Sequence, residues 1–412
     1  MHPKELLQLF RTRTAAEAAY VELSTFLRTA GSDAITEFVS AALDSEPSGG
    51  TFVDAALSYV AESDFAGLVK DSITRLRSDA ANEAAESVIA YASLQLPHTL
   101  QPHLQQLFAL RPNRQTYFEN WPWRVAGELD IAFLSREVRS ASDDIREKAL
   151  DCLIEARRDD AFRTAIDAAK GMGLAGEVST FLDAAGFDSQ LRPRYERSCK
   201  HIVFPPGYFI EQRPPWASRE AHPTWRLEGP DTEYRLGGPG TSSCGLCGGS
   251  LHHLITLPAS SVFGLGGDAV TVPLEVCLSC LGYERPVLSY RHTLDGLVEA
   301  LDIGSARPEF VADPLYATTV RLAPTPARWS WQDWGLSNSR ENLNRIGGHP
   351  CWIQSADWPN CAACGNDMGF FMQLDSDLRM SGNGSWLWGS GGICYAFRCP
   401  RCLVTAYSWQ CT

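Results

Sequence analysis

The sequence predicts an α+β protein with an all-helical N-terminal part and a β-rich C-terminal part that contains one unit twice. Three observations predict this class. Helix-forming residues dominate up to about residue 195, proline, glycine and tryptophan become frequent from about residue 196, and Cys-x-x-Cys motifs recur in the second part. Because 412 residues exceed the usual size of one core, we place domains at 1–195, 196–322 and 323–412.

Residues 1–195 have the pattern of successive amphipathic helices. Apolar residues recur at helical spacing, for example at Phe52, Ala55, Ala56, Tyr59 and Val60. The segment 142–169 resembles a helical pair of the HEAT type, with Ser142 or Asp143 as the N-cap. Such pairs stack into a curved solenoid whose concave face commonly binds proteins. A plain helical bundle is the alternative.

The 13 cysteines point to metal binding. The first residues lack the apolar region of a signal peptide, so we expect a cytoplasmic protein, where thiols stay reduced. Most of the cysteines form Cys-x-x-Cys pairs, and two such turns can complete a tetrahedron around one ion. The predicted zinc ligands are Cys244, Cys247, Cys277 and Cys280 at one site and Cys361, Cys364, Cys399 and Cys402 at the other.

Both predicted zinc sites are expected to be structural. A redox Cys-x-x-Cys of the thioredoxin type stands singly at the start of a helix, whereas this chain repeats the motif in loops. A catalytic zinc keeps one coordination position open, and two complete four-cysteine sets leave none. The spacing favours ligation within each copy, and exchange of cysteine pairs between the copies is the open alternative.

The two sites share more than their cysteines. The segment CGGSLHHLITL at 247–257 aligns without a gap with CGNDMGFFMQL at 364–374, and the apolar positions coincide. A His-Pro-x-Trp sequence also precedes each copy, at 222–225 and 349–352, and indicates a shared structural turn. This common register predicts an internal duplication in which each copy holds its own metal ion.

Periodicity predicts further elements in the second part. Residues of one helical face predict a crossover helix over 293–301, namely Leu294, Leu297, Val298 and Leu301. Apolar residues alternate over 393–397 and again over 403–410, which is the period of a strand. The last cysteine pair therefore lies between two predicted strands.

Four stretches of the second part resemble the bacterial YwqG-like family: RIGGHPCWIQ at 345–354, WPNC at 358–361, FFMQLD at 370–375 and GGICYAF at 391–397. This family shares a superfamily with the eukaryotic programmed cell death protein 2. The resemblance covers roughly 200–412 and is better in the second copy. It implies a duplicated β-rich unit, and either a chaperone role or toxin–antitoxin-type immunity. It implies no catalytic residues, and many members lack the full cysteine set.

Composition narrows the expected function. The net charge is −13 and neither half is basic, which argues against a nucleic-acid surface. No apolar run reaches the length of a membrane span. We therefore expect a non-enzymatic protein that binds a basic protein partner. The YwqG-like resemblance implies the most specific form of this expectation, an immunity protein that neutralises a cognate toxin.

Two other functions are kept as alternatives. One is a chaperone for a basic client protein. The other, from a different class, is an uncharacterised hydrolase or transferase that uses His349 with nearby carboxylates, at Asp357, Asp367, Asp375 and Asp377.

Overall fold

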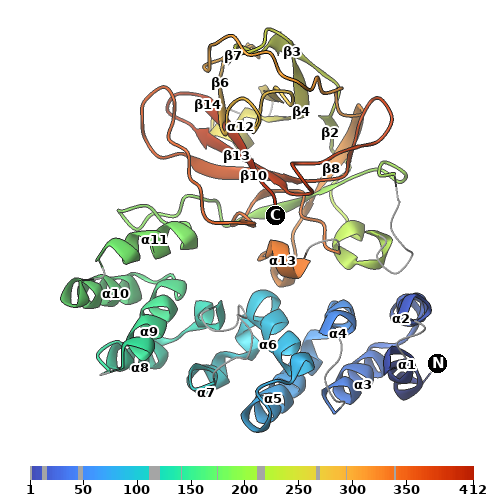
Figure 1. Cartoon of the computed structure of the whole chain (residues 1–412), viewed down its shortest axis with the longest axis vertical. Coiled ribbons are helices and arrows are strands. Elements are labelled where there is room, and N and C mark those ends of the chain that lie inside the picture. Colours follow the sequence, from blue (N-terminus) through green and yellow to red (C-terminus); the bar gives the residue numbers. More distant parts are fainter. Residues whose placement is uncertain are drawn as a thin grey trace. The chain divides into compact units, whose positions relative to one another are not determined.

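The computed structural model describes residues 2–11, 16–44, 50–110, 121–140, 142–173, 175–210, 219–265, 270–293, 295–337 and 340–412. They form two compact units (Figure 1). The helical unit comprises the described residues of Met1–Leu191 and Arg213–Pro223. The β-rich unit comprises those of Arg192–Gln212 and Thr224–Thr412 and contains every strand found in the described ranges. The predicted α+β class is therefore confirmed.

Helices build the first unit, and they contact mainly the helices adjacent or next but one along the chain. They are α1 (Pro3–Arg11), α2 (Ala16–Thr29), α3 (Ser32–Leu43), α4 (Gly50–Leu57), α5 (Glu62–Ser78), α6 (Glu83–Gln95), α7 (Leu104–Phe108), α8 (Glu128–Glu137), α9 (Asp143–Glu155), α10 (Asp159–Met172) and α11 (Ala175–Ala185). Short 3-10 helices cover Pro97–Thr99, Gln101–His103, Trp121–Val125 and Arg219–Ala221. Contacts between near neighbours are typical of stacked helical pairs.

The predicted pair at 142–169 is the pair α9 and α10. Ser142 is the N-cap residue of α9, although its side chain makes no capping hydrogen bond. Burial alone would raise the pKa of Glu155 at the end of α9, but the charges of Arg124 and Arg157 outweigh this effect and lower it. Glu155 thus forms two buried ion pairs just before the turn that leads into α10.

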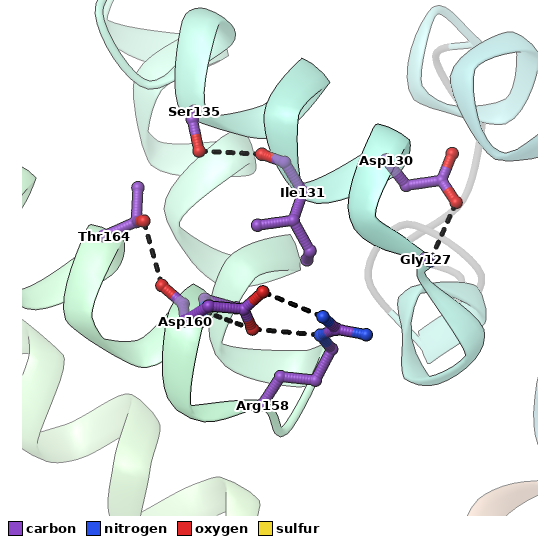
Figure 2. A network of polar contacts seen from close by, with 8 residues as sticks. Gly127, Asp130, Ile131, Ser135, Arg158, Asp160 and Thr164 are labelled. Carbon is purple, nitrogen blue, oxygen red and sulfur yellow. Dashed lines mark hydrogen bonds and ion pairs between the residues drawn. The ribbon is translucent and has the colours of Figure 1, made fainter.

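Polar contacts at the helix ends of this region are shown in Figure 2. The Asp130 carboxylate accepts a hydrogen bond of 2.9 Å from the backbone N–H of Gly127, at the start of α8. Arg158 donates two hydrogen bonds to Asp160 in the first turn of α10. Acidic groups here offset the partial positive charge of a helix N-terminus, so the sequence favours helix starts at both places.

Antiparallel strands build the second unit. In its described residues they form a 12-stranded sheet of order β3-β4-β2-β8-β1-β9-β10-β13-β14-β6-β7, with β5 beside β4 (Figure 1). The strands are β1 (Cys199–Val203), β2 (Glu233–Leu236), β3 (Pro239–Ser243), β4 (Ser250–Pro258), β5 (Thr271–Val276), β6 (Leu288–His292), β7 (Val298–Ala300), β8 (Thr318–Pro324), β9 (Arg345–Gly347), β10 (Gly369–Asp375), β13 (Ile393–Cys399) and β14 (Val404–Gln410).

Smaller elements complete the second unit. A separate two-stranded sheet joins β11 (Leu378–Arg379) and β12 (Ser385–Trp386). The helical segments are α12 (Ala259–Phe263), α13 (Trp334–Ser337) and the 3-10 helices Pro223–Arg226 and Ala327–Trp329. The ends of the large sheet, β3 and β7, lie against each other, so the sheet curls around a core of buried apolar side chains.

Strands β2 and β9 stand in the same relation to the two cysteine-bearing hairpins. Leu236 in β2 lies opposite Ile255 in β4, and Ile346 in β9 lies opposite Met372 in β10. Two glycines at positive φ follow each of these residues, at 237–238 and 347–348. Counting β1–β7 as one half of this unit and β8–β14 as the other, the corresponding segments are Arg-x-Gly-Gly at 235–238 and 345–348.

The shared His-Pro-x-Trp turn expected at 222–225 and 349–352 is wrong. Pro223–Arg226 forms a 3-10 helix, for which the proline supplies a suitable φ. Residues 349–352 instead follow β9 without helical structure. The two sequences match in residue type and not in conformation.

The first strand of each half pairs with a strand of the other half. β1 pairs with β9, where His201 lies opposite Arg345. β8 pairs with β2, where Thr319 lies opposite Arg235. β1 and β8 are also antiparallel neighbours of each other. The two halves are thus joined through one sheet in one compact unit.

The crossover helix predicted over 293–301 is wrong. Val298–Ala300 is strand β7, which pairs with β6, and Gly296 at φ 88° makes the turn between them. Asp-Gly is a strong hairpin signal, and here it outweighs the helical spacing of a short apolar run. Leu294 lies outside the described residues. The strands predicted over 393–397 and 403–410 are present as β13 and β14.

Candidate metal centres

Each four-cysteine group lies at one end of an antiparallel hairpin, β4–β5 or β10–β13. The two hairpins pair their strands in the same register. The first hairpin pairs His252 with Val276 at one end and Pro258 with Thr271 at the other. The second hairpin pairs Gly369 with Arg398 and Asp375 with Ile393 at the same two places. Each hairpin also has a register shift at the same place, between His253 and Ile255 and between Phe370 and Met372. A bulge at an equivalent position aims the flanking side chains in the same way.

The first cysteine loop of each hairpin has the same backbone hydrogen bonds. Cys244 N donates to Gly249 O, and Gly248 N donates to Cys244 O, at 2.8 and 2.9 Å. In the second hairpin Cys361 N donates to Asn366 O and Gly365 N to Cys361 O, both at 2.8 Å. Gly248 and Gly365 have φ values of 70° and 72°, which suit glycine. These turns direct the two sulfurs of each pair to one point.

The sulfur atoms are spaced as a tetrahedral site requires. Within each group all four Sγ atoms lie within 4.8 Å of one another. Cys244 Sγ is 3.9 Å from Cys280 Sγ, and Cys364 Sγ is 3.9 Å from Cys399 Sγ. Zn–S bonds of about 2.3 Å put the sulfurs of a tetrahedron about 3.8 Å apart. A disulfide needs about 2.05 Å, so the spacing fits a bound ion and excludes sulfur–sulfur bonds.

The structure brings together the cysteines of each copy, and the exchange of pairs between copies is not observed. Cys244, Cys247, Cys277 and Cys280 form one group, and Cys361, Cys364, Cys399 and Cys402 form the other. No further group of metal-ligating side chains occurs within the described ranges. These two groups can hold metal ions, and the soft thiolate set suits Zn2+.

The pKa values of the thiols differ within each group. Interaction with the Cys277 side chain lowers the pKa of Cys244, and the same interaction raises the pKa of Cys277. In the second group the backbone N–H of Asn366 lowers the pKa of Cys364 to about 7, while burial raises that of Cys399 to about 12. A coordinating thiol is deprotonated outright, so metal binding releases protons from both groups.

Two of the carboxylates considered for catalysis, Asp367 and Asp375, lie at opposite ends of β10. Asp367 lies before β10 and pairs with Arg194 at 3.2 Å, whereas Asp375 ends this strand. A strand of 7 residues spans roughly 20 Å, so the two groups cannot act on one substrate atom. His349 packs against the rings of Tyr195 and Trp331, with centroid separations of 5.1 and 5.6 Å, and these two rings also contact each other.

A buried polar network around Arg345 was not predicted. Arg345 is fully buried and donates to Gln332 Oε1 at 3.1 Å, to Cys351 Sγ and to His349 O. Gln332 in turn donates to the buried Glu341 carboxylate at 2.8 Å. Burial raises the pKa of Cys351 to about 11, so this thiol is an unreactive member of the network. The Arg-x-Gly-Gly sequence marks the position of Arg345 but does not indicate its burial, since Arg235 at the equivalent position is exposed.

No family model matches the chain, and no solved structure matches it. A stretch of 71 residues is 37% identical to YpfL, an uncharacterised protein of Salmonella typhimurium. The match covers 17% of this chain and 15% of that protein, so the chain spans only a small part of this relative's length. Within the described ranges, every helix is too short or too polar to cross a membrane.

Proposed function

We propose that this chain is a non-enzymatic protein-binding protein, and specifically an immunity protein that binds a cognate toxin and neutralises it. The observation that carries the proposal is the completeness of both cysteine groups. Four thiolates saturate a tetrahedral zinc and leave no coordination position for a substrate. Two structural Zn2+ ions would instead stiffen the β-rich unit as a surface for docking.

A duplicated, YwqG-like unit is part of this proposal. The matching registers, the matching bulges and the matching loop hydrogen bonds of the two hairpins support an internal duplication. In the first unit, contacts between neighbouring helices support a HEAT-like stack. Both kinds of repeat present extended surfaces, which suits a protein that covers part of another protein.

The expected partner is basic. A net charge of −13 attracts a positively charged protein and speeds their encounter. The same charge favours the second candidate, a chaperone for a basic client. The two differ in outcome, because an immunity protein stays bound and blocks activity, whereas a chaperone releases its client intact.

Co-expression with the product of the neighbouring open reading frame tests the proposal. A toxin should arrest growth when expressed alone, and this chain should restore growth and co-elute with it. Cys361→Ser should weaken both effects, and Cys411→Ser, outside the cysteine groups, should not. Release of a folded basic client would favour the chaperone. Turnover of a small substrate that Asp375→Ala abolishes without unfolding the chain would favour an enzyme.

A further inference from the structure

The loops of the two cysteine groups differ in how far the rest of the chain covers them. In the first group the residues between the paired cysteines are largely enclosed: Leu246, Leu278 and Ser279 are buried and Gly245 is half-buried. In the second group the residues at the same four places are all exposed: Ala362, Ala363, Pro400 and Arg401. Because the hairpins share one register, the difference comes from what lies over the loops.

The segment that follows β7 covers the first group. Gly304 N donates to Gly245 O at 3.0 Å, and Ala306 N donates to Leu246 O at 2.9 Å. The chain passes so close that a Cβ on Gly245 would overlap the carbonyl oxygen of Asp302. Glycine is therefore required at this place in the loop.

The same segment also covers the second loop of this group. Further along, Ala312 N donates to the buried hydroxyl of Ser279 at 3.0 Å. Ala312 O in turn contacts His252 Nε2 at 3.0 Å, which fixes this part of the segment to β4. Residues 302–312 thus close over both loops of the first group.

The second group has no such cover in the part of the chain that the structure describes. No hydrogen bond there joins residues 362–363 or 400–401 to another segment. Ala362 stands where the first loop has Gly245, so a segment placed as residues 302–306 are in the first group would overlap its methyl group. Cys364 and Cys402 are both half-buried, whereas Cys247 alone is half-buried in the first group.

We propose that the chain contains one sealed and one open metal centre, and that the ion held by Cys361, Cys364, Cys399 and Cys402 is the exchangeable one. The inference rests on both groups binding an ion. A chelator reaches the open centre from solution directly. Its access to the sealed centre is limited by residues 302–312, and it reaches most of these sulfurs only in the fraction of molecules in which this segment has opened locally.

Chelator competition on the full-length chain loaded with two equivalents of Zn2+ tests this. Excess 4-(2-pyridylazo)resorcinol should remove zinc in two phases of equal amplitude, the second at least about tenfold slower because it needs local opening. Native mass spectrometry after the first phase should show one ion. Cys364→Ser should remove the fast phase and Cys247→Ser the slow one. A single phase, or a fast phase that persists in Cys364→Ser, would overturn the proposal.

A matched pair of variants tests the cover itself. Gly245→Ala should displace residues 302–306 and convert the slow phase into a fast one. Ala362→Gly, at the equivalent place in the open centre, should leave the fast phase unchanged. If Gly245→Ala does not fold, Ala306→Pro removes the N–H that Leu246 O accepts and should have the same effect. Release rates in Gly245→Ala and Ala306→Pro that equal those of the wild type would contradict the cover.

The number of zinc ions bound per chain distinguishes a failure of this inference from a failure of the metal centres themselves. Two zinc ions per chain that leave at one rate would contradict only the sealed-and-open distinction. Purified chain that binds no zinc, by elemental analysis after incubation with the ion, would contradict the metal centres themselves.

Discussion

Gly237 and Gly347 occupy the same place in the two halves of the β-rich unit. Their φ values are 74° and 73°, and each directly follows the residue that pairs with the cysteine-bearing hairpin. A Cβ on Gly237 would overlap Tyr316 O, and a Cβ on Gly347 would overlap Ser198 O. The two halves therefore repeat both a backbone conformation and a close approach between segments.

Alanine at either glycine should destabilise the β-rich unit strongly. A positive φ costs an L-residue about 1–2 kcal/mol, and the overlap with a backbone oxygen adds to it, so we expect a loss of about 3 kcal/mol or more. Gly264→Ala is the matched control, because its φ is 69° and nothing lies within 4 Å of its Cβ position. Chemical denaturation should show a loss in the control that is at most half as large. Equal losses of stability at all three positions would contradict a contribution from the close approach of the backbone oxygens.

The sequence predicted what depends on local chemistry. Cysteines separated by two residues share one turn, so the four pairs could be predicted, and their spacing favoured the observed groups Cys244 to Cys280 and Cys361 to Cys402. Strands β13 and β14 followed from a period of two residues.

Pairings between distant segments were not predictable in the same way. Nothing local indicates that His201 lies opposite Arg345, because packing of the whole sheet decides it. The cover over Gly245 depends on residues more than fifty positions away, and the loop sequence alone does not show it. At 293–301 two local signals competed, and the Asp-Gly turn determined the structure.

Arg345 and Arg235 hold the same place in the two halves but differ in burial. Arg345 is fully buried, while Arg235 is exposed. Arg345→Met should cost about 3 kcal/mol, because Gln332 Oε1 loses its charged donor inside the protein. Arg235→Met should change stability by no more than about 0.5 kcal/mol. Urea denaturation of both variants measures the difference, and similar effects would contradict a role of the buried network in stability.

Buried histidines should make stability depend on pH. Burial lowers the pKa of His292 to about 4, below the ordinary value of about 6.5. Between these values the unfolded chain binds a proton that the folded chain does not. Stability is therefore present in full above pH 6.5 and is lost as the pH falls toward 4. One such group accounts for a loss of about 2 kcal/mol between pH 7 and pH 5.

Variants of the His292–Thr405 contact test this pH dependence. His292→Gln should reduce the loss between pH 7 and pH 5 by about 2 kcal/mol, since glutamine does not titrate. Thr405→Val removes the partner of His292 Nε2, at 2.8 Å, and leaves the histidine in place. It should lower stability at both pH values and leave the pH dependence unchanged. Denaturant midpoints at the two pH values give both results, and an unaltered slope in His292→Gln would contradict the prediction.

Loss of a single sulfur ligand should unfold one hairpin end and leave the other intact. The two groups are complete in themselves, so Cys361→Ser should reduce the zinc content from two ions per chain to one, and Cys244→Ser should do the same. Binding energy at a structural zinc is folding energy, so each variant should also melt at a lower temperature. Cys394→Ser is the control, because this cysteine is buried on β13 outside both groups and should keep two ions. Elemental analysis measures the zinc content of each variant, and thermal denaturation measures its melting temperature. Retention of two ions by Cys361→Ser would mean that its thiolate is not a ligand, and the four-sulfur geometry around it would then need another explanation.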